Sequence, residues 1–416
     1  MSNVSSSNSQ AVRVPKLRFP EFEGEWKSSR LSEFANRIVR KNTNNETVLP
    51  LTISSKDGLV DQVSYFNKTV ASKDMSEYYL LKQGEFAYNK SYSVGYDFGS
   101  IKRLDRYAKG ALSTLYICFE LTQNDSDFMK VYFDSLKWYK EIYMIAAEGA
   151  RNHGLLNVPT MDFFDTKHTL PKDIKEQQKI ARFMLLFEKR IEKQRQLIKL
   201  LKSYKRGVLS KLFPQKGETT PRYHFAGFTE PWEQRKWSDT VDISKDMVDP
   251  RTGEFDDLPH VAPGNIESFT GRLYDNVKTV KEENLISGKF RFHAGDIIYG
   301  KINPQLGKYV FAEFEGLTSA DAYILKAKNG VAQEYLFAVL QTRDFFNYSV
   351  SVSKRSGMPK INRDELNSYQ FFAPSETEQR KIGMCLLYLD NLITLHQHML
   401  NEFEQTKAGL LQQLFI

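Results

Sequence analysis

The chain has 416 residues, of which 41% are hydrophobic and 26% are charged. It is too long for one compact core and too rich in apolar residues for a disordered chain, so we expect a globular protein of at least two domains. The two cysteines, Cys118 and Cys385, exclude a disulfide framework and a cysteine zinc site, and no uncharged apolar run reaches the roughly 18–20 residues of a membrane span, so we expect a cytoplasmic protein.

The formal net charge of +7 is concentrated in one segment. Residues 172–216 contain 14 Lys and Arg against 4 Asp and Glu, whereas residues 1–171 and 217–373 are each close to neutral. The basic segment can be a solvated helix face, or it can contact DNA or a partner protein. The total charge alone therefore does not establish nucleic-acid binding.

Two motifs from the first half of the chain recur in the second half. The opening PKLRFPEFEGEW, from Pro15, is followed 206 residues later by PRYHFAGFTEPW, from Pro221. Farther along, Gly84–Lys90 recurs as Gly295–Lys301, in each case a turn followed by an apolar, β-prone run. Since the residues between these motifs differ strongly, the pattern predicts a duplicated scaffold that carries two different surfaces.

Each half ends in a segment with the heptad rhythm of a coiled-coil helix. The segments begin with the capping-box signatures Asp173-x-x-Glu176 and Ser375-x-x-Glu378. Every seam position of the second segment follows its counterpart by 202 residues, polar exceptions included. The seam positions are Ile180, Met184, Phe187, Ile191, Gln194, Ile198, Leu201, Lys205, Val208 and Leu212, and then Ile382, Leu386, Leu389, Ile393, His396, Leu400, Phe403, Lys407, Leu410 and Leu414.

Two matching seams predict that the segments 172–216 and 374–416 pair within one chain as a coiled coil. If a pseudo-two-fold axis relates the halves, the pair is antiparallel. The polar seam residues Gln194 and His396 then set its register. A helix of this length spans about 48 Å and would act as a spacer. The alternative interpretation is a pair of ordinary amphipathic surface helices.

Three features together resemble the specificity subunits of type I restriction-modification systems. They are the opening motif at Pro15, the internal repeat, and the helix starts of the form E-Q-x-K-I at Glu176–Ile180 and Glu378–Ile382. The resemblance implies two α/β (α+β) target-recognition domains, residues 1–171 and 217–373. The two long helices between and after them would fix the gap between the halves of a split, asymmetric DNA site.

The resemblance also implies the partners and cofactors of the complex. Partners would be double-stranded DNA, two modification (adenine methyltransferase) subunits and, in the full complex, two ATP-driven restriction subunits. The chain itself would be non-catalytic, with S-adenosylmethionine, ATP and Mg²⁺ bound by its partners. Two unlike recognition domains in one chain are expected to read a non-palindromic site, whereas a homodimer of one domain would impose a palindrome.

Loops that combine amide or histidine side chains with basic residues are the candidates for DNA contact. Two such loops lie in the sequence before the heptad segment that ends each half. Their candidate residues are Arg151, Asn152, His153 and Asn157 in the first, and Lys354, Arg355 and Lys360 in the second. Lys90 and Lys301, after the repeated strands, and Lys102 and Arg103, in a basic cluster, are further candidates. Each of these regions could instead be an ordinary solvated loop. Tyr88 and Tyr299, in the same strands, are expected in the core.

Two other functions were considered. A DNA adenine methyltransferase is suggested by Asn303-Pro304-Gln305-Leu306, which is similar to an N-P-P-[F/Y] loop but lacks the aromatic ring that grips a flipped base. There is no glycine-rich turn before it, and no GxxxxGK[ST], HExxH or GxSxG motif. His396 and His398 lie two residues apart on a helix and do not form a metal pair. A coiled-coil protein scaffold would leave the two divergent regions without a role, so the sequence favours non-catalytic DNA recognition.

Overall fold

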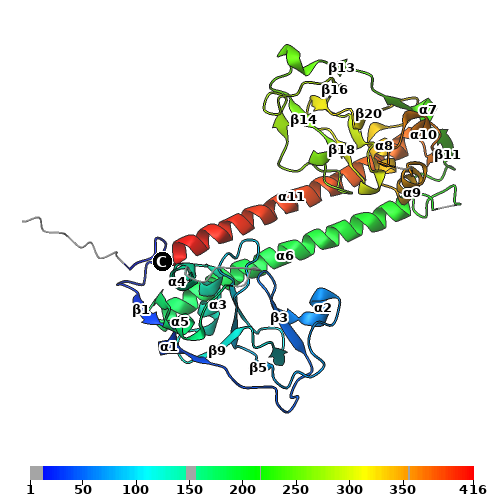
Figure 1. Ribbon diagram of the computed structural model, residues 1–416. Helices are drawn as coiled ribbons and strands as arrows, with labels where there is room; N and C mark the ends of the chain where they lie inside the picture. The colour runs from blue at the N-terminus through cyan, green and yellow to red at the C-terminus, as the bar shows by residue number, and fades with distance from the viewer. Residues whose placement is uncertain (1–12, 147–155, 216, 355–356) are drawn as a thin grey trace, which may run out of the picture. The chain divides into compact units, whose positions relative to one another are not determined.

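The computed structural model describes residues 13–146, 156–215, 217–354 and 357–416. The chain forms two compact units: unit 1 contains residues 1–193 and 401–416, and unit 2 contains residues 194–400. Two helices of 39 residues, α6 (Ile174–Leu212) and α11 (Glu376–Leu414), each contribute to both units (Figure 1). The units therefore differ from the four predicted segments in how they divide the helices, and the boundaries at 171, 216 and 373 stay predictions.

In its described part, unit 1 contains two four-stranded sheets and a two-stranded ribbon. The first sheet has the order β2-β9-β6-β7 and the second the order β4-β3-β8-β5, while β1 pairs with β10. The strands are β1 (Lys27–Arg30), β2 (Ala35–Arg37), β3 (Pro50–Ser54), β4 (Gly58–Asp61), β5 (Tyr79–Lys82), β6 (Phe86–Asn89), β7 (Ser100–Arg103), β8 (Lys109–Leu112), β9 (Ile117–Leu121) and β10 (Lys167–Leu170).

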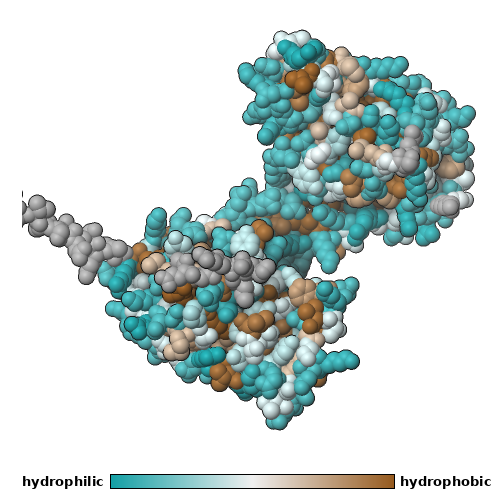
Figure 2. Space-filling view, viewed as in Figure 1, coloured by the Kyte–Doolittle hydropathy of each residue, from teal (hydrophilic) through white to brown (hydrophobic). Residues whose placement is uncertain are grey.

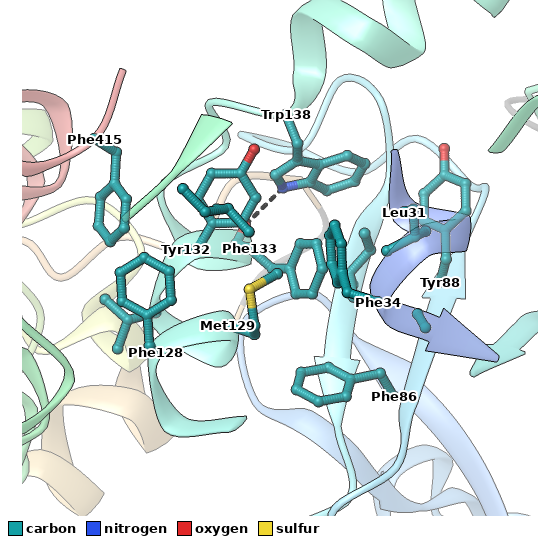
Figure 3. Packing of buried hydrophobic residues seen from close by; sticks show 14 of the residues in the cluster. Leu31, Phe34, Phe86, Tyr88, Phe128, Met129, Tyr132, Phe133, Trp138 and Phe415 are labelled. Atoms are coloured by element: carbon teal, nitrogen blue, oxygen red, sulfur yellow. Dashed lines mark hydrogen bonds between the residues drawn. The ribbon is translucent and has the colours of Figure 1, made fainter. Parts of the chain in front are cut away.

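Short helices in unit 1 carry half of the buried aromatic residues of its core. They are α1 (Leu31–Phe34), α2 (Gln62–Phe66), α3 (Ser126–Asp134), α4 (Tyr139–Ala146) and α5 (Thr160–Asp165). Asp125 starts α3 by accepting a hydrogen bond from Phe128 N (2.8 Å), and the helix then buries its apolar side chains. Figure 3 shows them packed together, with the Trp138 Nε1–H donating to Phe133 O (2.8 Å). Phe415, from beyond α11, packs 5.6 Å from Phe128, so the C-terminal end of the chain completes this core.

Among its described residues, unit 2 contains eleven strands and four α-helices in addition to its parts of α6 and α11. The strands are β11 (Glu233–Lys236), β12 (Val241–Ile243), β13 (Met247–Val248), β14 (Pro259–Val261), β15 (Lys278–Thr279), β16 (Lys289–Phe292), β17 (Ile297–Gly300), β18 (Tyr309–Phe311), β19 (Gly316–Thr318), β20 (Ala322–Ala327) and β21 (Gln370–Ala373). The helices are α7 (Trp237–Thr240), α8 (Gln333–Leu340), α9 (Arg343–Val352) and α10 (Arg363–Asn367), with 3₁₀ turns η1 (Pro250–Thr252), η2 (Pro263–Asn265) and η3 (Pro304–Leu306).

The strand order of unit 2 repeats that of unit 1. The order β12-β20-β17-β18 matches β2-β9-β6-β7, and β15-β14-β19-β16 matches β4-β3-β8-β5. Even the one parallel pairing recurs, as β3–β8 and β14–β19. The predicted duplication is thus confirmed, and unit 2 adds β13 at one edge.

The repeated turn before β6 and β17 has a physical explanation. Gly84 and Gly295 both have φ +90°, a conformation that glycine adopts without strain. The acidic residue that follows closes the turn, because Glu85 accepts from Lys82 N (2.7 Å) and Asp296 accepts from His293 N (2.9 Å). The tyrosines of the two strands, Tyr88 and Tyr299, are buried as expected.

The predicted seam between α6 and α11 is confirmed in both units. All twenty seam positions are buried or half-buried. In unit 1 the rings of Phe187 and Phe403 lie 6.1 Å apart, and in unit 2 Gln194 Nε2 donates to His396 O (2.8 Å). Since residues early in α6 contact residues late in α11, the helices are antiparallel, as expected.

The polar seam positions are all paired across the seam. Gln194 Nε2 also lies 2.8 Å from His396 Nδ1, Lys205 pairs with Asp390, and Lys407 Nζ lies 2.6 Å from Glu188 Oε1. The two ion pairs are equivalents, because Asp390 follows Glu188 by 202 residues, as Lys407 follows Lys205. Burial lowers the pKa of Lys205 and raises the pKa of Asp390.

Removing one partner of the buried pair is expected to destabilise the chain strongly. Asp390→Ala leaves the Lys205 ammonium, whose side chain is 11% exposed, without its partner, which costs about 3–5 kcal/mol of unfolding free energy. Lys205→Met with Asp390→Leu replaces both charges and is expected to cost much less. Urea unfolding of the single and double variants measures the difference. The matched control is Glu188→Ala, where the partners are 29% and 25% exposed and the expected loss is about 1 kcal/mol. Equal losses for Asp390→Ala and Glu188→Ala would contradict the assignment.

One buried histidine makes the stability of unit 1 depend on pH. His168 in β10 lies between Tyr132 OH (3.0 Å from Nδ1) and Thr166 Oγ1 (2.9 Å from Nε2). Burial lowers its pKa to about 3. The corresponding position of β21, by its pairing with β11, is Phe371.

Stability is expected to fall as the pH drops below about 6.5, because the unfolded state then binds a proton at His168 that the folded state does not. The loss is about 1.4 kcal/mol per pH unit between roughly pH 6 and pH 3. His168→Phe combined with Tyr132→Phe removes this contribution without stranding the tyrosine hydroxyl, and Tyr132→Phe alone is the control. The measurement is the urea concentration at the unfolding midpoint between pH 5 and pH 7.5. If the midpoint of the double variant fell with decreasing pH as steeply as that of Tyr132→Phe, the titration of His168 would be excluded as the cause.

Candidate nucleic-acid interface

The repeated opening motif binds the start of the long helix. In unit 1 the Glu176 carboxylate is 2% exposed and accepts from Arg18 Nε (2.7 Å), Arg18 Nη2 (2.8 Å) and Trp26 Nε1 (3.2 Å). In unit 2 the equivalent Glu378 lies 3.0 Å from His224 Nδ1. Asp173 caps α6 as expected by accepting from Lys175 N (2.8 Å). The glutamate half of each expected capping box is wrong, because the buried carboxylates of Glu176 and Glu378 bond instead to side chains of the opening motif.

The neighbouring glutamines attach the rest of each unit to the same helix start. Gln177 accepts from Asp125 N (2.8 Å), at the cap of α3, and donates to Pro171 O (2.9 Å). Gln379 accepts from Ala332 N (2.9 Å), at the start of α8, and donates to Pro374 O (2.8 Å). The E-Q pair of the sequence motif is thus a structural anchor. Sequence reasoning missed this role, although the recurrence of the pair was a usable signal.

The candidate loops lie beside the ends of the repeated strands. In unit 1, Leu156 N donates to Lys90 O (2.9 Å), which places Asn157 next to the end of β6. In unit 2, Ile361 N donates to Lys301 O (3.0 Å), which places Lys360 next to the end of β17. Lys90 with Asn157, and Lys301 with Lys360, are thus brought together in equivalent places. Arg151, Asn152, His153 and Arg355 lie outside the described residues.

The lysines of this region in unit 2 are available to a ligand. Lys354 and Lys360 are exposed, and within the part of the chain that the structure describes no carboxylate pairs with either of them. Lys301 is half-buried, with its Nζ 5.3 Å from the centroid of the Tyr323 ring. Such cations can neutralise phosphates without first breaking an internal ion pair.

Lys102 and Arg103 are in a different environment, because both are held in internal ion pairs. Lys102 Nζ lies 2.6 Å from Asp134, and Arg103 binds Asp105 (2.6 Å) and Asp127 (2.7 Å). Burial disfavours the charge of Lys102, but Asp134 outweighs this effect and raises its pKa. They line a cavity of about 290 Å³ in which acidic and basic side chains alternate. A contact of these two residues with DNA stays a prediction.

The surface contains no extended apolar area on the face shown in Figure 2. Both units are mainly hydrophilic there, with hydrophobic side chains in separate spots. Among the described helices none is long and apolar enough to cross a membrane. The described residues also contain no group of three or more His, Cys, Asp or Glu that could hold a metal ion.

Comparison with known proteins supports the predicted family. Residues 229–405 match the family model described as type I restriction modification DNA specificity domain. The type I restriction enzyme EcoDI specificity subunit of Escherichia coli is 30% identical over 165 residues, which are 39% of this chain and 36% of that protein. The matches to curated relatives span between 28% and 37% of the length of those proteins.

Two solved structures are similar to nearly the whole chain. The S subunit of a type I restriction-modification system from M. genitalium has a TM-score of 0.61 at 13% identity and covers 97% of this chain and 99% of that one. A chain from a structure on complex assembly and conformational transition of the type I R-M system has a TM-score of 0.50 at 16% identity, with 94% and 97% covered. The likenesses to solved structures show the fold of nearly the whole chain. The sequence match shows that residues 229–405 belong to the family described as type I restriction modification DNA specificity domain.

Proposed function

We propose that this chain is the non-catalytic DNA-recognition subunit of a type I restriction-modification complex. The observation that supports this most directly is that two units share one strand order and one helix anchor, yet carry different side chains at the same strand ends. A repeated scaffold with unlike surfaces suits the reading of two unlike half-sites.

Each unit would read one half of a bipartite, asymmetric DNA site. The connection after β6 in unit 1 carries Ser91, Tyr92 and Ser93, whereas the connection after β17 in unit 2 carries Asn303 and Gln305. Hydroxyl and amide groups make different hydrogen bonds to base edges, so the two halves of the target would differ in sequence. Cations such as Lys360 would hold the phosphates beside them.

The helix pair would set the spacing of the half-sites and bind the modification subunits. Apolar side chains outside the seam support a docking role, since Leu186, Leu200 and Tyr204 on α6, and Tyr388 and Leu395 on α11, are exposed. Two methyltransferase subunits would bind here, and two restriction subunits would join the full complex. S-adenosylmethionine, ATP and Mg²⁺ would be bound by these partners, in the cytoplasm.

The decisive experiment maps methylated adenine in a cell that contains this chain and its methyltransferase subunit as the sole adenine-methylation system. A single non-palindromic sequence, in two parts with a fixed gap, is expected, because one chain holds both recognition units. The control is the methyltransferase subunit without this chain, which should leave the sites unmethylated. A palindromic target would contradict the proposal, and so would methyl transfer by the isolated chain from labelled S-adenosylmethionine, which would favour the methyltransferase alternative.

Exchanging the exposed lysines of unit 2 is expected to weaken DNA binding without changing its sequence preference. Lys354→Ala with Lys360→Ala removes two phosphate contacts, so the slope of log affinity against log salt should decrease by about 2. The measurement is a salt titration of DNA binding by the complex with methyltransferase subunits. Lys236→Ala with Lys278→Ala, two exposed lysines on β11 and β15, is the matched control. The same slope in both double variants would remove Lys354 and Lys360 from the interface.

A further inference from the structure

The segment Asn303–Leu306, which has no part in the family resemblance, forms the connection between β17 and β18 in unit 2. Asn303 (φ +51°) and Gly307 (φ +56°) are both in the left-handed region, and the η3 turn between them is closed by Leu306 N donating to Asn303 O (2.8 Å). Pro304 is buried, so its side chain attaches the connection to the body of unit 2. The result is a tight tip at the end of β17.

Neighbouring loops hold this tip in place from two sides. Asn303 N donates to Pro359 O (2.8 Å), and Phe269 N donates to Gly307 O (2.9 Å). The Phe269 ring packs so closely over Gly307 that a Cβ there would lie 2.4 Å from it, which excludes any other residue at this position. The tip is thus pre-organised by contacts with two loops that are far from it in the sequence.

On this tip, Gln305 is exposed. Its Nε2 donates to Asn303 Oδ1 (3.2 Å), which restrains the amide of this exposed side chain. Leu306 beside it is 44% exposed. Lys301 precedes the tip in the chain, and Lys360 pairs with its base through the bridge between Ile302 and Lys360. One amide and one apolar side chain are therefore exposed on the tip, and two lysines lie at its base.

This arrangement has the chemistry of a base reader. A glutamine amide can bind adenine bidentately in the major groove, accepting from N6 and donating to N7, and an apolar side chain can contact the thymine methyl group. Lysines at the base of the tip can bind the phosphates next to that base pair and so fix the register of the protein on the duplex. A rigid support lowers the ordering cost of such a contact.

We propose that the β17–β18 tip is the base-reading element of unit 2, with Gln305 contacting an adenine in the major groove. This rests on the proposed function, since it names the residue by which unit 2 reads its half-site. The equivalent connection of unit 1, between β6 and β7, presents Tyr92 and Val94 instead, which are 55% and 90% exposed. A change at Gln305 should therefore affect one half-site and leave the other half-site as an internal reference.

The test uses the complex of the full chain with its methyltransferase subunits. Binding and methylation are measured on duplexes that carry each single base-pair change in both half-sites, for the natural protein, Gln305→Ala and Gln305→Glu. Gln305→Ala should reduce the preference for one adenine by about tenfold to a hundredfold, at one position of one half-site. Gln305→Glu, which can only accept hydrogen bonds, should shift that position toward cytosine. Gln234→Ala, an exposed glutamine on β11, is the matched control and should change nothing.

The outcomes separate the two proposals. If the natural protein prefers a bipartite site and Gln305→Ala keeps the same preference at every position of both half-sites, the role of Gln305 is overturned while the proposed function stands. If the natural protein shows no bipartite preference, the proposed function fails, and the base-reading role fails with it. Since Gln305 is exposed, the variants should fold. A melting temperature equal to that of the natural protein checks this.

Discussion

The buried glutamate and glutamine at the start of each long helix are the constraint on which the rest of each unit depends. Glu176 ties the opening motif to α6, and Gln177 ties the cap of α3 to the same turn. A buried carboxylate without a partner would lower the free energy of unfolding by several kcal/mol. These contacts therefore fix the position of the first turn of the helix within its unit.

The two units share the residues that build the scaffold and differ in the connections that it carries. The anchor, the sheet order and the glycine turns before β6 and β17 are the same in both units, whereas the connections after those strands differ in length and side chains. Because the exposed residues of these connections, such as Tyr92 and Gln305, lie outside the core, they can be exchanged at little cost to folding. Recognition is thereby separated from stability within each unit.

The sequence predicted those features whose cause is local or periodic. Gln194 and His396 interrupt two heptad patterns at matching positions, so their role in setting the register was predicted from the pattern. The hydrogen bond between them is a finding of the structure. The cap by Asp173 is local and was predicted correctly. The role of Glu176 was wrong because its partner is Arg18, 158 residues away, and no local rule identifies such a distant partner. For the same reason the ion pair of Lys102 with Asp134 was not foreseen, since a basic cluster in a sequence does not show which acids fold against it.

The two seam ion pairs have equivalent residues in the two units but differ in how far their side chains are buried. Lys205 with Asp390 and Lys407 with Glu188 are the same pair at a spacing of 202 residues, yet the first is 11% exposed and the second two to three times more. A pair near water contributes little, whereas a buried pair mainly penalises any arrangement that separates it. The buried pair therefore restricts the register of the helices in unit 2 more strongly than its equivalent does in unit 1. Equal sequence at the seam thus leads to unequal energetic roles, and the difference comes from the side chains that each unit packs against its part of the helices.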